Sequence, residues 1–402
     1  MGKKDSEIIV IGCGDAGLSA AYAAKRQSPA CSVTVVSNED SYYPRCPLPY
    51  LVSGEITEKL DKPLDEIFRA SGIKVVKDKA LKISDSVECE NSELGFDKVI
   101  IATGASSVCL PGTVPLRTIE DAEKIKKRCG NSTVVVGAGL MGCELASVLK
   151  CTLLEKQQQV LPGFDPRISK AVKKELENQG VKVLTDSSEI PEVGLKISAA
   201  GVRPNIKLAQ DSNIKCSENG IIVGDNLETS MKNVYAAGDC IEQKSFVTNK
   251  PIHARLGPQA ERQGFIAGTN ASGGKMVYRG VLGAAIAKIA SLEIGRTGVS
   301  AGLPEMVSSK IKTTTKPEFH PTSKDLFLKL VFSRKQLVGA EAMGGESVAG
   351  VIDVASLAIQ KKATVDDLIN FAYSYAPPMC SAPNPFVLCS QIAKQKYEHG
   401  LG

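Results

Sequence analysis

The sequence predicts an α/β protein in which two similar lobes, each built on a parallel sheet, are followed by a smaller α+β domain. Two observations support this fold class. A short apolar run that leads into a glycine-rich turn and then into a helical segment occurs twice, near residue 12 and near residue 137. Beyond about residue 310 the pattern changes to a hairpin followed by amphipathic helices.

The first of these units begins with an apolar run, EIIVI, at residues 7–11, which is typical of a buried strand. The turn after it carries Gly12, Gly14 and Gly17 in the spacing G-x-G-x-x-G, and residues 33–36 supply the next strand. Glycines at this spacing allow a tight turn, close approach of a pyrophosphate and close packing of helix on strand. Since a helix N-terminus also offers free N–H groups to phosphates, we predict that a dinucleotide binds here.

The sequence offers two candidates for the residue that holds the ribose in this unit. A carboxylate usually stands about 20 residues beyond the last glycine, and Ser37 occupies that place. Glu39 follows two residues later and could reach the ribose, whereas Ser37 could make a weaker hydrogen bond. Both residues remain candidates.

The second unit repeats the pattern, with the strand TVVV at residues 133–136 and the turn residues Gly137, Gly139 and Gly142. Its acidic residue is Glu155, at the end of the following strand. A carboxylate there would accept hydrogen bonds from both ribose hydroxyls and would repel a 2′-phosphate. The second lobe is therefore expected to favour NADH over NADPH.

The second unit is also shorter than the first. The interval from Gly17 to Ser37 is 20 positions, but the interval from Gly142 to Glu155 is only 13. The helix must therefore end near Lys150, with almost no turn before the next strand. We expect this shortening to weaken coenzyme binding or to tilt the nicotinamide.

Two further strands decide the domain organisation. The segments KVIIATGAS at 98–106 and NVYAAGDC at 233–240 look like buried strands that end in turns, on either side of the second unit. A first lobe interrupted by the second explains their order. The expected domains are a discontinuous first lobe of residues 1–110 and 221–305, an inserted lobe of residues 111–220, and a C-terminal domain of residues 306–402.

The C-terminal domain has its own local signals. Residues 327–345 predict a β-hairpin, and residues 348–362 predict an amphipathic helix with an apolar stripe. Thr364 is expected to cap a short helix that carries Asp366 and Asp367 in its first turn, where negative charge is favourable.

Composition excludes several classes of function. A net charge of +5 over 402 residues is too small for a typical nucleic-acid binder or polybasic membrane protein. We expect no signal peptide, and no apolar run approaches the roughly 18 residues of a membrane helix. The 12 cysteines are scattered and the 3 histidines form no metal-ligand pattern. We therefore expect a cytoplasmic protein with mostly free thiols, and no metal, membrane or nucleic-acid partner.

In combination, these motifs resemble a known family. The two glycine turns, the ATG turn at 102–104, TSMKNVYAAGD at 229–239 and YPRCPLPY at 43–50 are similar to the pyridine nucleotide–disulfide oxidoreductases. The narrower resemblance is to the single-cysteine branch: coenzyme A disulfide reductases, NADH oxidases and NADH peroxidases. It covers roughly residues 7–395. It implies a Rossmann-like FAD lobe, a Rossmann-like NAD(P)H lobe and a dimerisation domain that completes the partner's active site in a homodimer.

The resemblance also assigns residues to the two cofactors. Asp239 would bind the ribityl or phosphate part of FAD, and Glu144 would lie near the nicotinamide. The positions implied around the cofactors are, for FAD, Thr103, Gly104, Gly238 and Asp239, and, for the nicotinamide, Glu144 and Gly201.

Cys46 stands where this branch keeps its redox cysteine. A thiolate there could accept electrons from the flavin or hold them in a mixed disulfide, and Arg45 beside it could lower the pKa of the thiol. Leu51 occupies the position where a C-x-x-x-x-C pair would have its second cysteine. Cys46 would therefore resolve with a substrate thiol, as a sulfenic acid or with another cysteine.

Other candidate residues lie near the substrate. In the segment SYAPPMC, Tyr375 matches the tyrosine of coenzyme A disulfide reductases that reaches the partner's cysteine, where it could protonate a departing thiolate. Cys380 could approach Cys46 of the partner subunit, although a packing thiol is the simpler interpretation. Lys25 and Arg26 match basic residues that bind the phosphates of coenzyme A, or else they complement a helix C-terminus.

The favoured function is an FAD-dependent NAD(P)H oxidoreductase that reduces coenzyme A disulfide, or a related low-molecular-weight disulfide or persulfide, through Cys46. Two alternatives remain open: an NADH oxidase that cycles through a cysteine sulfenic acid, and a flavin-containing redox sensor with a crippled NADH site. Oxidase and peroxidase members favour histidine where this chain has Asp15, and they lack the Y-A-P-P segment. Both points favour a disulfide substrate.

Overall fold

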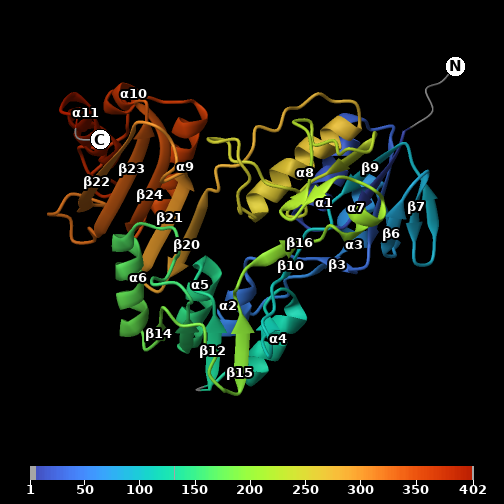
Figure 1. The fold of residues 1–402 in the computed structure, drawn as a ribbon, viewed down its shortest axis with the longest axis horizontal. Coiled ribbons are helices and arrows are strands. Elements are labelled where there is room, and N and C mark those ends of the chain that lie inside the picture. Colours follow the sequence, from blue (N-terminus) through green and yellow to red (C-terminus); the bar gives the residue numbers. More distant parts are fainter. Residues whose placement is uncertain (1–5, 131, 401–402) are drawn as a thin grey trace. The chain divides into compact units, whose positions relative to one another are not determined.

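The computed structural model describes residues 6–130 and 132–400, which form two compact units of the predicted α/β class. The first unit contains the residues up to Val108 together with Val202–Lys244 and Lys250–Val281. The second contains Cys109–Gly201, Ser245–Asn249 and the residues from Leu282 onward. Figure 1 follows the chain from blue to red through these elements.

A five-stranded parallel sheet forms the centre of the first unit, in the order β19-β9-β1-β2-β5. In register, Val10 lies opposite Val35 on one side and Ile100 on the other. The strands are continuous apolar runs because a parallel sheet is buried on both faces. Their bounds are β1 (Glu7–Ile11), β2 (Ser32–Ser37), β5 (Lys74–Lys77), β9 (Lys98–Ile101) and β19 (Val234–Ala236).

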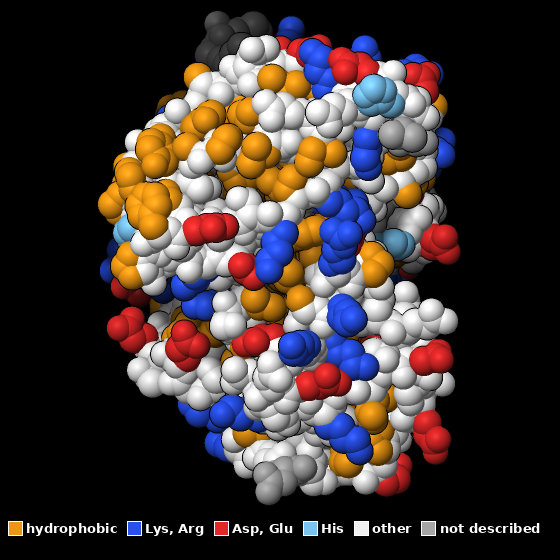
Figure 2. Space-filling model, turned by 90° about the vertical axis from the view of Figure 1, so that its left-hand side faces the viewer, with side chains coloured by type: hydrophobic (Ala, Val, Ile, Leu, Met, Phe, Trp, Pro, Cys, Tyr) orange, Lys and Arg blue, Asp and Glu red, His pale blue; other side chains and the backbone are white. Residues whose placement is uncertain are grey.

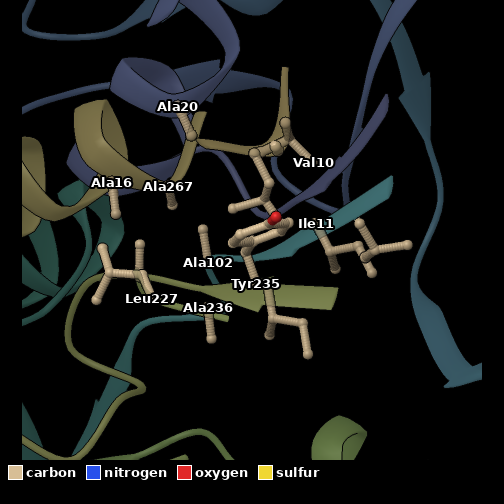
Figure 3. Close-up of a cluster of buried hydrophobic side chains, with 14 of the residues drawn as sticks. Val10, Ile11, Ala16, Ala20, Ala102, Leu227, Tyr235, Ala236 and Ala267 are labelled. Atoms are coloured by element: carbon tan, nitrogen blue, oxygen red, sulfur yellow. The ribbon is translucent and has the colours of Figure 1, made fainter. Parts of the chain in front are cut away.

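Two helices, α1 (Asp15–Gln27) and α8 (Gly257–Ala271), pack closely together in this unit. Close packing is possible because α8 places glycines at the contact: a Cβ on Gly264 would collide with the carbonyl of Ala16, and one on Gly268 with that of Ala20. Figure 3 shows part of the buried core around these alanines and the strands. The small residues therefore fix the position of the helix that starts at the first glycine turn.

The remaining elements of the first unit are short. A three-stranded antiparallel meander lies between β5 and β9 in the chain: β6 (Ala80–Ile83), β7 (Ser86–Cys89) and β8 (Glu93–Gly95). The two-stranded pairs are β3 (Ser41–Tyr42) with β4 (Lys62–Pro63), β10 (Ala105–Ser107) with β16 (Val202–Pro204), and β17 (Cys216–Ser217) with β18 (Gly220–Ile221). The short helices are α2 (Leu48–Ser53), α3 (Leu64–Phe68), the 3₁₀ helix η1 (Arg69–Ser71) and α7 (Lys207–Asp211).

The second unit contains another five-stranded parallel sheet, in the order β11-β15-β12-β13-β14. Helix α5 (Leu140–Leu149) ends at Lys150, whose φ of 49° is left-handed, and the next strand starts at Thr152. The short return expected from the sequence is confirmed. The other elements of this lobe are β11 (Val114–Pro115), β12 (Thr133–Val136), β13 (Thr152–Leu154), β14 (Lys182–Leu184), β15 (Leu195–Ser198), α4 (Ile119–Arg128) and α6 (Pro166–Asn178).

An antiparallel sheet in the order β20-β21-β24-β23-β22 completes the second unit. Helices α9 and α11 pack on it and enclose a separate apolar core. The bounds are β20 (Ala285–Ile289), β21 (Leu292–Gly298), β22 (Met306–Thr314), β23 (Asp325–Ser333), β24 (Gln336–Gly344), α9 (Val348–Gln360), α10 (Val365–Ile369) and α11 (Pro385–Glu398).

Local predictions for this domain are confirmed. The hairpin β23–β24 turns at Arg334 and Lys335, both with positive φ, as in the primed turns that suit the twist of paired strands. Thr364 forms a capping box with Asp367, in which each side chain accepts a hydrogen bond from the other's backbone N–H.

Strand pairing moves two of the domain boundaries expected from the sequence. Residues 202–220 were expected in the inserted lobe, but β16 pairs with β10 of the first unit. Residues 285–298 were expected in the first lobe, but β21 pairs along its length with β24 of the C-terminal sheet. The C-terminal domain therefore starts near Ala285 rather than at residue 306.

Candidate active site

The first glycine turn has the geometry of a phosphate cradle. Gly12 has φ +95°, and a Cβ there would lie 2.5 Å from the carbonyl oxygen of Ala102, while one on Gly17 would collide with the carbonyl of Gly12. A Cβ on Gly14 would meet nothing within 4 Å. No side chain caps the start of α1. Two of the glycines are therefore required by the fold, and the third borders open space beside free helix N–H groups, which fits a dinucleotide pyrophosphate.

The second glycine turn repeats this geometry. Gly137 has φ +106°, and a Cβ there would lie 2.6 Å from the carbonyl oxygen of Ala199. A Cβ on Gly142 would collide with the carbonyl of Gly137, whereas Gly139 again borders open space. The shortened lobe therefore keeps a complete cradle.

Glu155 is held beside this second cradle. The residue is buried; its Oε2 accepts a hydrogen bond from Ala138 N at 2.7 Å and its Oε1 accepts one from Gln157 N at 2.9 Å. Carboxylate oxygens have about four acceptor sites in total. Glu155 is thus a fixed acceptor with capacity left for ribose hydroxyls.

The two residues expected near the nicotinamide, Glu144 and Gly201, both belong to the second unit. Glu144 sits in α5, and its Oε1 accepts a hydrogen bond from Lys288 N of β20 at 3.4 Å. Gly201 is exposed, has φ +100° and has open space where a Cβ would be. The hydrogen bond from β20 thus orients the carboxylate of Glu144. The sequence alone did not indicate this contact between α5 and β20.

In the first lobe, both candidates for the FAD ribose have other partners. Ser37 is buried, and its Oγ accepts a hydrogen bond from Glu39 N at 3.0 Å. The carboxylate of Glu39 accepts two hydrogen bonds from Arg45 Nη2, at 2.8 and 3.0 Å. Arg45 Nη1 also donates to Tyr43 Oη at 3.2 Å. The positive charge that we expected to act on Cys46 is therefore offset by Glu39.

Cys46 is an exposed thiol in the turn just before α2. All 12 cysteines lie among the described residues as thiols, and of these only Cys46 and Cys109 are exposed. Burial raises the pKa of the Cys143 thiol to about 12 and that of Cys240 to about 11. Because the thiolate is the reactive form, these buried cysteines are inert, and Cys46 is accessible to a substrate.

The other residues assigned to FAD meet at the ends of β9 and β19. Thr103 Oγ1 donates to Asn205 O at 2.8 Å, and Asn205 Nδ2 donates to Thr103 O at 2.8 Å. Gly238 N donates to Gln263 Oε1 at 2.8 Å. Gly104 and Gly238 have positive φ, and the carbonyl of Asp239 accepts from Arg255 Nε at 3.1 Å. Asn205 and Gln263 are supporting residues that the sequence analysis missed, because only the fold brings them to these turns.

A pocket of about 370 Å³ lies in the first unit, along a stripe of α1 that runs from Asp15 through Tyr22 to Arg26. Its other walls include Tyr42 of β3 and two residues of α8, Glu261 and Phe265. Tyr42 Oη donates to Asp15 Oδ1 at 2.8 Å, and burial together with this bond raises the pKa of Tyr42.

The structure separates the two basic residues expected to bind substrate. Arg26 lines the pocket. Lys25 does not, and its Nζ donates instead to the carbonyl of Cys31 at 2.8 Å. The interpretation of Lys25 as a structural residue at a helix C-terminus therefore fits the geometry better than a substrate contact.

The remaining site predictions lie in the second unit. Tyr375 is 51% exposed, with its side chain open to solvent. Cys380 is half-buried, and its Sγ donates to the carbonyl of Ser374 at 3.4 Å. Over residues 6–130 and 132–400 we find no group of three or more His, Cys, Asp or Glu side chains that could hold a metal, and no helix long and apolar enough to cross a membrane.

Comparison with known proteins agrees with this geometry. The family model for pyridine nucleotide-disulphide oxidoreductases matches residues 6–264, and the model for that family's dimerisation domain matches residues 285–384. An NADH oxidase of Methanocaldococcus jannaschii is 32% identical over 96% of this chain and 98% of its own. A CoA-dependent NAD(P)H sulfur oxidoreductase of Pyrococcus furiosus is 30% identical over 96% and 99%.

A solved structure has the same fold. The NAD-dependent persulfide reductase from A. fulgidus superposes with a TM-score of 0.92 at 29% identity, covering 98% of this chain and 84% of that one. With the family models and the sequence relatives, this establishes that the chain belongs to the pyridine nucleotide–disulphide oxidoreductase family.

Proposed function

We propose that the protein uses NADH to reduce a low-molecular-weight disulfide or persulfide, with coenzyme A disulfide as the leading candidate. The observation that carries the proposal is the exposed thiol of Cys46, in the lobe that holds the first glycine cradle. Leu51 stands where an internal partner cysteine would be. We propose that Cys46 takes its second sulfur from the substrate.

The family implies FAD and NAD(P)H, and each glycine cradle suits one of them. The turn at Gly14 and the start of α1 would hold the pyrophosphate of FAD, near Thr103 and Asp239. The turn at Gly139, with Glu155, would hold NADH. When bound, FAD takes a hydride from the nicotinamide and delivers two electrons to sulfur.

Cys46 would carry the disulfide chemistry. Its thiolate attacks one sulfur of a disulfide RSSR, forms a Cys46–S–S–R bond and releases RS⁻. Two electrons then cleave the mixed disulfide and restore the thiolate with a second RS⁻, and both leaving groups take up protons. The balance is NADH, one proton and RSSR in, and NAD⁺ with two RSH out.

The pocket along α1 supports a long thiol substrate. At 1.5 Å per residue, the stripe from Asp15 to Arg26 is about 16 Å long. It is lined by the aromatic rings of Tyr22 and Phe265, with the cation of Arg26 at one end. An extended thiol with an anionic phosphate head, such as coenzyme A, suits this distribution. The Pyrococcus relative is described as CoA-dependent.

NADH is the proposed electron donor. Glu155 is fixed by two backbone N–H groups at the place where a 2′-phosphate would lie. A like charge held so firmly disfavours NADPH. The complete glycine cradle of the second lobe also disfavours the alternative function, a redox sensor whose NADH site is inactive.

A homodimer is the proposed assembly. The C-terminal domain exposes large apolar side chains, including Ile286, Leu357 and Met379, and hydrophobic side chains gather on the face shown in Figure 2. Apolar patches of this kind mark interaction sites, and the domain matches the family's dimerisation model. Tyr375 would then serve Cys46 of the partner subunit as a proton donor.

The 12 cysteine thiols also support a reducing compartment. Cysteines that persist as thiols are typical of proteins in the cytosol. We therefore place the protein in the cytoplasm.

Anaerobic mixing of the FAD-loaded protein with NADH tests the proposal. We expect the flavin absorbance to bleach, and to recover when coenzyme A disulfide is added. In Cys46→Ser the recovery should be lost while bleaching remains. A Cys46→Ser variant that still reduces the disulfide at the parent rate would contradict the proposal, and no bleaching in the parent would favour the sensor.

An NADH oxidase is the second candidate, because the relative at 32% identity carries that name. In that case Cys46 would cycle through a sulfenic acid with oxygen as acceptor. Oxygen uptake at the full rate of NADH oxidation, with no effect of added disulfide, would favour it. Asp15, which is bonded to Tyr42, weighs against this reading because oxidases favour histidine there.

A further inference from the structure

We propose that Glu39 is a positioning residue that holds the guanidinium of Arg45 and thereby sets the reactivity of the Cys46 thiol. The inference rests on the proposed redox role of Cys46. It assigns Glu39 to the redox loop rather than to the FAD ribose, one of the two places that its sequence position allowed.

Hydrogen bonds hold both the backbone and the carboxylate of Glu39 in place. The hydroxyl of Ser37 accepts a hydrogen bond from Glu39 N and donates one to Glu39 O, each at 3.0 Å, which fixes the backbone of Glu39 at the end of β2. Both carboxylate oxygens of Glu39 then accept from Arg45 Nη2. The anchored carboxylate therefore determines where the guanidinium can lie.

Tyr43 holds the guanidinium from a second side. Arg45 lies over the ring of Tyr43, with its Cζ 5.0 Å from the ring centroid, and donates to the hydroxyl. The Arg45 side chain is only 27% exposed. A cation held by a carboxylate and an aromatic ring loses most of its freedom to swing towards solvent.

Arg45 directly precedes Cys46 in the chain, and its guanidinium is the cation that we propose acts on the thiolate. A cation within about 4–6 Å typically lowers a thiol pKa. A carboxylate bound to that cation cancels much of the effect. Glu39 thus restrains the thiolate fraction of Cys46 through Arg45.

Other titratable groups near this loop have their own partners. Burial, reinforced by the negative charge of Glu39, raises the pKa of the Cys13 thiol in the first glycine turn to about 12. Asp40 pairs with Lys77 at 2.6 Å, and both side chains are 68% exposed. Asp40 is therefore a matched control: it is adjacent to Glu39, carries the same charge and belongs to a different ion pair.

The test is the pH dependence of Cys46 alkylation by iodoacetamide, measured on the FAD-loaded protein by mass spectrometry of the Cys46 peptide. The variants are E39Q, R45Q, the double variant and D40N as the control. FAD content and far-UV circular dichroism establish that each variant folds. The assay requires no turnover, so its outcome is independent of the physiological substrate.

We expect E39Q to lower the pH midpoint of alkylation by about 0.5–1 unit and R45Q to raise it by about 1 unit. In the R45Q background the E39Q change should have little further effect, and D40N should leave the midpoint unchanged. An unmoved midpoint in E39Q, an equal shift in D40N or a full E39Q shift without Arg45 would each overturn the inference. Loss of FAD from E39Q would assign Glu39 to the cofactor instead. Failure of the proposed function would appear separately, as disulfide reduction that survives Cys46→Ser.

Discussion

The two glycine lobes have the same parallel sheet but differ in what surrounds it. Strand β1 of the first lobe corresponds to β12 of the second, with equivalent neighbours on each side. The first lobe adds a meander, β6 to β8, between its strands β5 and β9, whereas residues 185–194, between β14 and β15, contain no strand. Helix α1 has 13 residues and α5 has 10.

This difference separates what the cradle needs from what it does not. In both cradles a Cβ on the first glycine would lie at nearly the same distance from a neighbouring carbonyl oxygen, 2.5 Å at Gly12 and 2.6 Å at Gly137. The last turn of the helix and the meander can therefore be removed without disturbing the site where phosphates bind. Only the strand, the turn and the first helical turns determine the cradle.

The two lobes are also supported differently. Helix α1 is covered by α8, whereas α5 packs against β20 of the C-terminal sheet. In the second unit, Asp165 at the start of α6 pairs with Lys310 at 2.7 Å and with Lys329 at 3.4 Å. Lys329 also pairs with Glu341 at 2.8 Å. The shorter lobe is thus tied to the dimerisation sheet by buried charges.

The largest expected effect comes from adding one methyl group to either cradle. Gly17→Ala would push its Cβ into the carbonyl of Gly12, and Gly142→Ala would push its Cβ into the carbonyl of Gly137. We expect Gly17→Ala to lose FAD, and Gly142→Ala to keep FAD but to lose reduction by NADH at least about 100-fold. Flavin absorbance and anaerobic bleaching distinguish the two results. If Gly142→Ala lost FAD instead, the assignment of the lobes would be reversed.

The second-largest effect is expected from removing a buried charge in the second unit. Asp165→Ala removes the carboxylate that pairs with Lys310 and leaves Lys329 with Glu341 alone, and such changes cost about 3–5 kcal/mol of unfolding free energy. Lys312→Met, which breaks the exposed pair with Asp325, should cost under about 1 kcal/mol. Urea unfolding measures both. Equal effects would show that the buried network is not what ties the second lobe to the sheet.

The same network predicts a pH dependence of stability. Burial alone would raise the pKa of Asp165, but Lys310 and Lys329 outweigh it and hold the pKa below its usual range. Its contribution is therefore complete above the ordinary carboxyl pKa of about 4 and is lost as the pH falls through the lower, folded value. Unfolding followed from pH 7 to pH 2 should show this loss in the parent but not in Asp165→Asn.

A smaller effect is expected at the ribose of the second lobe. Glu155→Gln removes the charge that repels a 2′-phosphate and weakens the bonds to the ribose hydroxyls. We expect KM for NADH to rise about tenfold and the preference over NADPH to fall by at least as much. Steady-state kinetics with each coenzyme provide the measurement. An unchanged preference would mean that another residue selects the coenzyme.

The smallest effect concerns the pocket of the first lobe. Arg26→Gln should raise KM for coenzyme A disulfide about fivefold, since it removes one exposed phosphate contact. The neighbouring change Lys25→Gln should have no effect, because that side chain binds the carbonyl of Cys31 instead. A disulfide without phosphate, such as pantethine, should not distinguish the variants. Equal effects of both changes would place the phosphate elsewhere.

Features that depend on neighbouring residues could be predicted from the sequence. The glycine spacing, the short return after α5 and the capping box at Thr364 are all local. The separation of Lys25 from Arg26 could also have been found, because Asp15, Tyr22 and Arg26 lie on one helical stripe and Lys25 does not.

Features that join distant segments could not be predicted. The pairing of β21 with β24 joins residues 41 to 51 positions apart in the chain, and nothing in residues 292–298 indicates which sheet they enter. The Arg45–Glu39 pair depends on the path of the loop between β2 and α2. The sequence indicates a cation beside Cys46, but only the fold shows the carboxylate that offsets it.

The central claim is that both lobes cooperate to deliver electrons to Cys46 and then to a substrate disulfide. Its most direct test is the number of thiols released per NADH oxidised, measured without oxygen in the presence of coenzyme A disulfide. The mechanism predicts two thiols per NADH in the parent protein and none in Cys46→Ser. NADH oxidation that releases no thiol, or thiol release that persists without Cys46, would contradict it.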